Sequence, residues 1–299
     1  MKKKFMSIAL ASVMALSLAG CGGSAGGTTT AADTTAAAPA DTTAEASSED
    51  TTAADNTSAE AAEATESAGG TLIVGFDQDF PPMGFIGDDG EFTGFDLELA
   101  QEVAKRLGLE YKPQPIAWDA KDMELEAGNI DCIWNGFTMT GREDDYAWTD
   151  AYMANTQVFV VAKDSGIASQ ADLAGKVVEC QVDSSAEAAL KEVPDLTATF
   201  KDLLTTADYN TAFMDLEQGA VDAIAMDVIV AGYQIQQRNA DFVILDDSLS
   251  AEEYGVGFKK DNTELRDKVQ KTLEEMAADG TLKSISEKWF GEDVTTIGK

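Results

Sequence analysis

A loop of small and polar residues follows a short apolar segment near the middle of the chain. Residues 131–134 read as the end of a strand, and the chemistry-bearing residues after them are Asn135, Gly136, Thr138, Thr140, Gly141 and Arg142. A guanidinium binds both oxygens of a carboxylate through parallel charge-assisted hydrogen bonds, while hydroxyl and backbone N–H groups take the remaining lone pairs. The loop therefore predicts a carboxylate site. A surface turn with a solvated arginine is an alternative that the loop alone leaves equally open.

Further polar residues stand where predicted strands end. Ser184 and Ser185 follow a strand and begin a helix, whose free N–H groups and dipole favour an anion. Asp227 closes the strand 222–226 and could meet an ammonium group. Each of these residues also has a simpler interpretation as a helix cap.

Two aromatic residues and one acid complete the candidate site. Asp77 and Phe80 lie in a proline-broken loop after the buried strand 71–76, at the strand end where ligands bind in open parallel sheets. Trp118 precedes a short helix and, taken alone, fits core packing better than the wall of a pocket.

The composition excludes several kinds of function. The chain has 299 residues, no histidine and a formal net charge of −33, so nucleic acid and anionic lipid offer it no electrostatic attraction. Without histidine or a close cysteine pair, zinc binding and histidine-based catalysis lose their usual residues. No catalytic residue, metal or cofactor is predicted. Cys132 and Cys180 are either a disulfide or two buried thiols, and the sequence leaves both open.

The first 70 residues are predicted to lie outside the globular part. Residues 1–21 have a basic start, a short apolar run and the sequence Leu-Ala-Gly before Cys21, as in a lipoprotein signal peptide whose cysteine is lipidated. Residues 22–70 contain no lysine, arginine or aromatic residue. Such a segment cannot bury enough apolar surface to fold, so we expect a disordered tether.

Strand and helix patterns alternate from residue 71 to the end. The helix after Asp96 carries Leu99, Val103 and Leu107 at spacing four, with Asp96 placed to cap it and Gly108 placed to end it. A second α/β series begins near residue 154, and helices return after residue 260. This order predicts two α/β lobes with a cleft between them.

Several motifs, in this order and spacing, make residues 71–291 similar to the family 3 extracellular solute-binding proteins of amino-acid ABC importers. The motifs are Gly94-Phe95-Asp96, Gly136-Phe137-Thr138-Met139-Thr140 with Arg142, Asp172-Leu173-Ala174-Gly175-Lys176, Ser184-Ser185, Asp222 to Asp227, and Lys288-Trp289-Phe290-Gly291. The resemblance implies the type II periplasmic-binding-protein fold for residues 71–299. Lobe 1 would comprise 71–153 and 255–299, and lobe 2 would comprise 154–254.

The resemblance also implies how the carboxylate of an amino acid is bound. Arg142 would take the α-carboxylate in a bidentate pair. Thr138 or Thr140 would assist it, and so would Ser184 and Ser185.

The remaining roles concern the ammonium group and the side chain of the ligand. Asp227 and the carbonyl of Gly136 would hold the α-ammonium. Phe80 and Trp118 would enclose the aliphatic part of the side chain, and Asp77 would read its polar end. The charges suit this reading independently, because a zwitterion in a closed cleft needs a cation at one end and an acid at the other.

The chain departs from the family pattern at two positions. Only Gly141 separates Thr140 from Arg142, where relatives usually have two residues, and this puts the reach of Arg142 in question. Asp183 stands where relatives often carry glycine, which adds a negative charge near the carboxylate site and favours a cationic or neutral ligand.

We therefore expect a monomeric, lipid-anchored binding protein on the outer face of the cell membrane, extracellular or periplasmic. It would deliver a polar L-amino acid, of the glutamine, cystine or basic type, to the transmembrane subunits of an ABC permease. One alternative is a sensory amino-acid-binding domain. Another is an enzyme on the same fold resembling cyclohexadienyl dehydratases, which would need a general acid such as Glu179 or Glu187 in the cleft.

Overall fold

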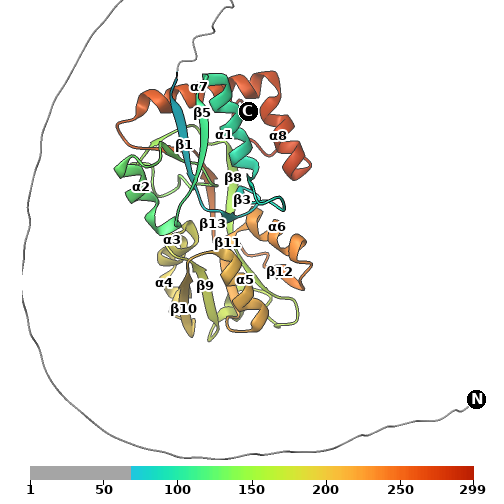
Figure 1. Ribbon diagram of the computed structural model, residues 1–299. Helices are drawn as coiled ribbons and strands as arrows, with labels where there is room; N and C mark the ends of the chain where they lie inside the picture. The colour runs from blue at the N-terminus through green and yellow to red at the C-terminus, as the bar shows by residue number, and fades with distance from the viewer. Residues whose placement is uncertain (1–68) are drawn as a thin grey trace, which may run out of the picture. The chain divides into compact units, whose positions relative to one another are not determined.

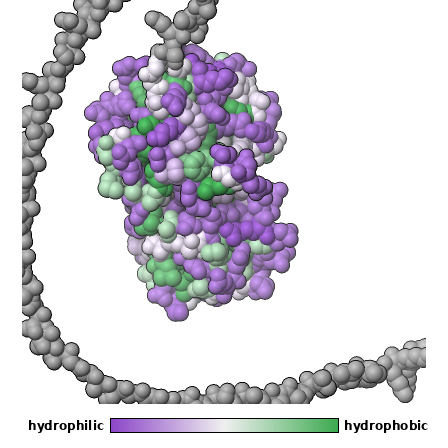
Figure 2. Space-filling view, in the orientation of Figure 1, coloured by the Kyte–Doolittle hydropathy of each residue, from purple (hydrophilic) through white to green (hydrophobic). Residues whose placement is uncertain are grey.

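Two larger β-sheets, one small β-sheet and the surrounding helices make up residues 69–299, the part of the chain that the computed structural model describes (Figure 1). The predicted signal peptide with Cys21 and the predicted tether up to residue 68 lie outside the described residues. Hydrophilic residues cover most of the face drawn in Figure 2, and the large apolar side chains are mostly buried.

The first sheet combines strands from residues 71–148 with one strand from residues 257–258. Its strands follow in the order β5 (Glu110–Pro115), β1 (Thr71–Phe76), β6 (Cys132–Ile133), β14 (Gly257–Phe258) and β7 (Ala147–Trp148). The strands β5, β1 and β6 are parallel, whereas β14 is antiparallel to both of its neighbours. The helices on this side are α1 (Phe95–Leu107), α2 (Lys121–Ala127), α7 (Thr263–Asp279) and α8 (Thr281–Phe290), with a 3-10 turn at Trp118–Ala120. A small antiparallel sheet beside them consists of β2 (Asp79–Phe80), β3 (Gly84–Ile86) and β4 (Phe92–Thr93).

The second sheet contains the middle of the chain. Its strands follow in the order β10 (Asp202–Thr206), β9 (Val177–Gln181), β11 (Ala223–Asp227), β8 (Met153–Ala162) and β12 (Phe242–Ile244), and β13 (Ser250–Tyr254) also pairs with β8. The strands β10, β9 and β11 are parallel, and β8 is antiparallel to β11. The helices here are α3 (Ser185–Glu192), α4 (Pro194–Thr197), α5 (Tyr209–Gln218) and α6 (Val228–Arg238), with a 3-10 turn at Gln170–Leu173.

The chain changes sheet twice. It leaves the first sheet between β7 and β8, and it returns between β13 and β14. Near these crossings β8 and β13 pair antiparallel, from Met153 opposite Tyr254 to Gln157 opposite Ser250. The residue boundaries predicted for the two lobes stay predictions.

Helix α1 illustrates how far local sequence determined an element. The helix ends as predicted at Gly108, whose φ of 67° places it in the left-handed region that glycine adopts at low cost. The predicted cap is wrong, because Gly94 is the N-cap and Asp96 lies inside the first turn. Asp96 is instead fully buried and accepts hydrogen bonds from the backbone N–H of Gly136 at 2.6 Å and from the hydroxyl of Tyr152 at 2.8 Å. The helix thereby holds the loop that was predicted to bind a carboxylate.

The described residues settle the state of the two cysteines. Cys132 on β6 and Cys180 on β9 are free, buried thiols, so the disulfide alternative is wrong. Residues 69–299 contain no group of three or more histidine, cysteine, aspartate or glutamate side chains arranged to hold a metal ion. None of their helices is both long and apolar enough to span a membrane.

Candidate ligand-binding site

A cavity with about 280 Å³ of empty space lies where residues attached to the two sheets meet. Its lining residues are Asp77, Phe80, Trp118, Asn135, Gly136, Thr138, Arg142, Gln181, Ser184, Ser185 and Asp227. All of the predicted binding residues line it except Thr140. The backbone N–H of Arg142 donates to the carbonyl of Met139 at 2.8 Å, and this turn leaves Thr140 exposed at its corner.

The loop after β6 provides the cation of the cavity. The guanidinium of Arg142 donates to the carbonyl of Thr138 at 3.2 Å and lies 5.4 Å from the centre of the Phe137 ring. Within residues 69–299 Arg142 takes part in no ion pair, so its charge is available to an anion. The shortened loop therefore still brings Arg142 to the cavity. The hydroxyl of Thr138 is buried and has no hydrogen-bond partner among the described residues.

The opposite wall comes from the start of helix α3. Ser184 is the N-cap of this helix, and its hydroxyl oxygen accepts a hydrogen bond from the backbone N–H of Glu187 at 3.1 Å. The hydroxyl oxygen of Ser185 accepts one from Nε2 of Gln157 at 2.9 Å. Each hydroxyl group can also donate one hydrogen bond. Ser184 is thus the helix cap, and its place in the cavity lining is compatible with the predicted carboxylate role.

Asp227 is the acid of the cavity. It ends strand β11 and is the N-cap residue of helix α6, but its side chain makes no capping hydrogen bond and is 3% exposed. Its Oδ1 accepts hydrogen bonds from Asn155, Gln157 and the hydroxyl of Tyr254, at 2.7, 2.8 and 2.6 Å. Burial, and then the negative charge of Glu252, raise the pKa of Asp227 well above its ordinary value, so a cation is needed to keep it ionised.

Two polar residues lie beside Asp77: Asn135, which the sequence placed in the loop without a binding role, and Gln181, which sequence reasoning missed. Asn135 accepts a hydrogen bond from the backbone N–H of Asp77 at 3.0 Å, and its buried Nδ2 has no partner within the described part of the chain. Gln181 donates to Oδ2 of Asp77 at 2.6 Å and to the carbonyl of Ala207 at 2.9 Å. Burial raises the pKa of Asp77 to about 6, although hydrogen bonds from Asp79 and Gln181 oppose the rise. Asn135 follows β6 and Gln181 ends β9. Polar residues at the carboxyl ends of strands often line ligand sites, so this pattern was the signal that could have identified both of them.

Aromatic rings form the remaining walls. Trp118 is 9% exposed and meets the ring of Phe137 edge-on, with ring centres 5.6 Å apart. The ring of Phe80 lies 5.9 Å from that of Tyr209 on the side of the second sheet. Trp118 therefore belongs both to an apolar cluster and to the cavity wall, and the two interpretations of this residue are compatible.

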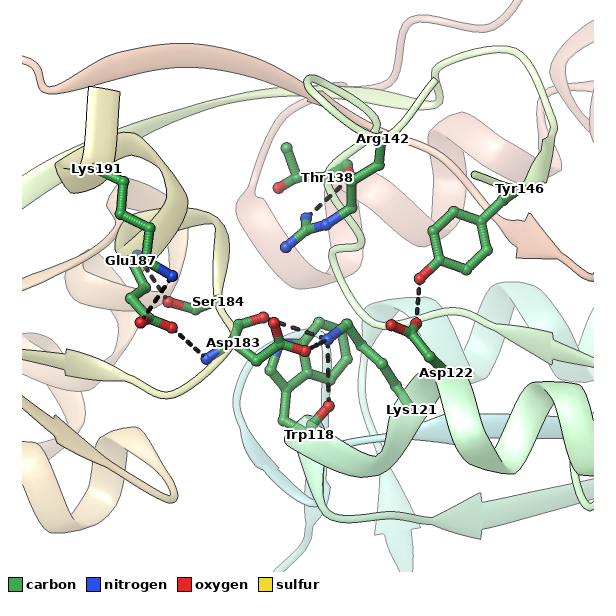
Figure 3. A network of polar contacts seen from close by, with 10 residues as sticks. All are labelled: Trp118, Lys121, Asp122, Thr138, Arg142, Tyr146, Asp183, Ser184, Glu187 and Lys191. Carbon is green, nitrogen blue, oxygen red and sulfur yellow. Dashed lines mark hydrogen bonds and ion pairs between the residues drawn. The ribbon is translucent and has the colours of Figure 1, made fainter. Parts of the chain in front are cut away.

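Three polar contacts join the two sides next to the cavity. They are Asp77 with Gln181 at 2.6 Å, Asp79 with Asn210 at 2.8 Å, and the ion pair of Lys121 with Asp183. Figure 3 shows Lys121 reaching Asp183 beside the Trp118 ring. Asp183 does not line the cavity, and the cation of Lys121 neutralises its charge. The expectation that Asp183 adds negative charge near the carboxylate site is thereby corrected.

Comparison with known proteins identifies the family. Residues 72–292 match the family described as "Bacterial extracellular solute-binding proteins, family 3". The chain belongs to this family. The predicted family membership is confirmed.

Several relatives of this family 3 solute-binding protein are named for the amino acid that they bind. The L-cystine-binding protein TcyJ of Escherichia coli (strain K12) is 35% identical over 229 residues, which cover 76% of this chain and 85% of TcyJ. The arginine-binding extracellular protein ArtP of Bacillus subtilis (strain 168) is 32% identical over 231 residues, which cover 76% of this chain and 88% of ArtP.

Solved structures agree with these relatives. A substrate-binding protein of an ABC uptake transporter from Streptococcus pneumoniae, with bound histidine, has a TM-score of 0.74 and 36% identity, over 76% of this chain and 94% of that one. An ancestral arginine-binding protein bound to glutamine has a TM-score of 0.69 and 39% identity, over 75% and 99% of the two chains. The type II periplasmic-binding-protein fold is confirmed for this family 3 solute-binding protein.

The candidate acids of the enzyme alternative lie away from the cavity. Glu187 accepts a hydrogen bond from the backbone N–H of Asp183 at 2.7 Å and pairs with Lys191 at 2.9 Å. Glu179 is buried on β9, and burial, together with the charges of Asp215 and Asp208, raises its pKa to about 7. Neither carboxyl lines the cavity. The relatives are binding proteins by name, which favours binding over turnover.

Proposed function

We propose that this protein is the substrate-binding component of an ABC importer and that its cavity takes one polar L-amino acid, of the glutamine, cystine or basic type. One observation carries the proposal: Arg142, a cation without an ion pair in residues 69–299, and the buried acid Asp227 line the same cavity. A free amino acid brings one carboxylate and one ammonium group. Leaving either of them unpaired in a closed site costs several kcal/mol, so the arrangement selects a zwitterion.

The carboxylate and ammonium roles follow from the chemistry of the walls. The guanidinium of Arg142 and the hydroxyls of Thr138, Ser184 and Ser185 are donors, which suit the ligand carboxylate. Asp227 is an acceptor, which suits the ammonium group.

The other end of the cavity supports a polar side chain. Among the other lining residues, Phe80 and Trp118 offer apolar surface, Asp77 offers an acceptor, and Nδ2 of Asn135 offers an unused donor. An amide, a cationic group or the second half of cystine could use this mixture. The names of the cystine-binding and arginine-binding relatives support the same classes of ligand.

We further propose that the protein acts as a monomer, held on the outer face of the cell membrane by a lipid on Cys21, and passes its ligand to the permease. Cells fed labelled palmitate should incorporate the label into this protein, and the Cys21→Ser variant should lose it. Equal labelling of the two proteins would contradict the anchor without touching the binding proposal.

A thermal-shift screen of the purified protein against the common L-amino acids and cystine tests the binding proposal. A ligand at 100 times its Kd stabilises the folded state by about 2.7 kcal/mol, which raises the melting temperature of a domain of this size by roughly 5 °C or more. We expect this rise with one or a few polar amino acids. It should vanish in Arg142→Ala and Asp227→Asn and persist in Arg106→Ala, a matched control outside the cavity. No rise with any amino acid would overturn the proposal.

A further inference from the structure

Asp227 is one half of a pair of buried carboxyl groups. Glu252 on β13 lies opposite Asn155 on β8, and its exposed fraction is 6%, against 3% for Asp227. Nδ2 of Asn155 donates to Oδ1 of Asp227 at 2.7 Å and to Oε1 of Glu252 at 2.6 Å. Nε2 of Gln157 donates to the same two oxygens at 2.8 Å each. The two acids therefore share both of their amide donors and lie against one another.

No cation of the described residues neutralises this pair. Neither Asp227 nor Glu252 takes part in an ion pair within residues 69–299. Two adjacent carboxylates in a buried site cannot both ionise cheaply, because desolvation and mutual repulsion both favour keeping one proton. Burial and the charge of Glu252 raise the pKa of Asp227 accordingly.

The other titratable groups around the pair do not change this conclusion. From β13, the hydroxyl of Tyr254 donates to Oδ1 of Asp227 at 2.6 Å. From α5, Tyr209 faces Asp227 and donates to the carbonyl of Ala225 at 3.3 Å. Arg142 and Asp77 line the same cavity from the first sheet, where Arg142 is the only cationic side chain among the lining residues. If the ligand carboxylate pairs with Arg142, the ligand's ammonium group is the cation that can pair with Asp227 and Glu252.

We propose that Asp227, held against Glu252, carries a proton in the ligand-free protein and that binding of the ligand's ammonium group releases this proton to solvent. The inference rests on the proposed function. Asp227 lines the cavity and touches the ammonium group, and Glu252 is a positioning residue that acts through its contact with Asp227. No covalent bond changes: the ammonium charge enters the site as the proton leaves, and Asp227 is then ionised beside the ammonium.

This exchange makes the affinity for the ligand increase with pH. Asp227 binds its proton more tightly in the free protein than in the complex, so lowering the pH favours the free protein. Affinity should rise with pH by up to about tenfold per pH unit while one proton is released. It should level off once Asp227 of the free protein loses its proton.

Calorimetry of the full chain counts the released protons directly. Titrations with L-glutamine, L-arginine and L-cystine at pH 7, in phosphate and in imidazole buffer, give the count from the difference in heat between buffers. At pH 7 Asp77, with a pKa of about 6, is mostly ionised and contributes little. We expect close to one proton per ligand bound for the wild type. Glu252→Gln should release less than half as much, because Asp227 no longer faces a second acid.

Glu253→Gln is the matched control, since Glu253 is the next residue on β13 and is exposed. It should release as many protons as the wild type. Binding by the wild type without proton release would overturn the inference, whether or not Glu252→Gln folds. Equal release by the wild type and a folded Glu252→Gln would also overturn it. Absence of binding heat with all three ligands would instead overturn the proposed function, and the inference with it.

Discussion

Gly136 lies in the cavity wall with a φ of 57°, a conformation that residues with a side chain rarely adopt. A Cβ atom at this position would come within 3.1 Å of Cε1 of Phe80 and 3.2 Å of Cε2 of Tyr254. We therefore expect Gly136→Ala to push these rings into or away from the cavity and to lower the affinity for the ligand at least tenfold. The strained backbone should also cost about 1 to 2 kcal/mol of stability.

Gly141 provides the control for this substitution. It belongs to the same loop and has a φ of 81°, but no atom lies within 4 Å of its Cβ position. Gly141→Ala should therefore cost similar stability and leave the affinity within about twofold, because only the backbone term remains. Chemical denaturation and calorimetric titration separate the two effects. Equal affinity losses in both variants would show that backbone strain, and not crowding, controls the cavity.

Among the elements, helix α2 and the turn between β9 and α3 are joined by the ion pair of Lys121 and Asp183. The side chain of Lys121 is 1% exposed, and Asp183 has a φ of 57°, which asparagine also tolerates. The partners come from different sheets, so the pair breaks if the lobes separate. We therefore expect the pair to favour the state in which the two sides of the cavity stay together.

Asp183→Asn should accelerate ligand dissociation. We expect loss of this ion pair to cost about 1 to 2 kcal/mol of binding free energy, between the values for exposed and for buried ion pairs. This corresponds to roughly a tenfold loss in affinity. Stopped-flow tryptophan fluorescence measures the rate, because Trp118, one of the four tryptophans, lies in the cavity wall. The control is Glu126→Gln, which removes the exposed pair of Glu126 and Lys259 on the side of the first sheet only. A dissociation rate unchanged by Asp183→Asn would rule out a role of this pair in closure.

For the molecule as a whole, buried acids set the dependence of stability on pH. The pKa values of Asp77, Asp96 and Glu179 are raised to about 6, 7 and 7, mainly by burial. An acid whose folded pKa is raised contributes stability that is present below its ordinary pKa and is lost as the pH rises through the folded value. Acids with lowered pKa values, such as Asp279 at about 2, act in the opposite direction at lower pH.

The ligand-free protein should therefore melt at a lower temperature at pH 8 than at pH 5. Glu179→Gln should flatten this decline, because it removes one of the titrating groups, and it should leave ligand affinity unchanged since Glu179 lies outside the cavity. Glu192→Gln, an exposed substitution on α3, should keep the wild-type slope. Melting curves at several pH values test this, and a melting temperature that rises steadily from pH 5 to 8 would contradict it.

The sequence by itself determined the order of the elements and the family. Apolar spacing and turn residues located helices such as α1 and its end at Gly108, because these signals act between residues within one or two turns. Polar residues at strand ends were sufficient to nominate Arg142, Ser184 and Asp227, since the carboxyl ends of parallel strands meet at one edge.

Tertiary structure alone decided which side chains meet. The pairing of β8 with β13 brings Glu252 next to Asp227. The contact between the two sides of the cavity lets Asp183 form an ion pair with Lys121. Asp96 looked like a cap but holds Gly136 from 40 residues away, and Asn135 and Gln181 flank Asp77 from different sheets. Such contacts depend on strand register and lobe closure, which are set by the packing of the whole chain, so no local pattern of residues contains them.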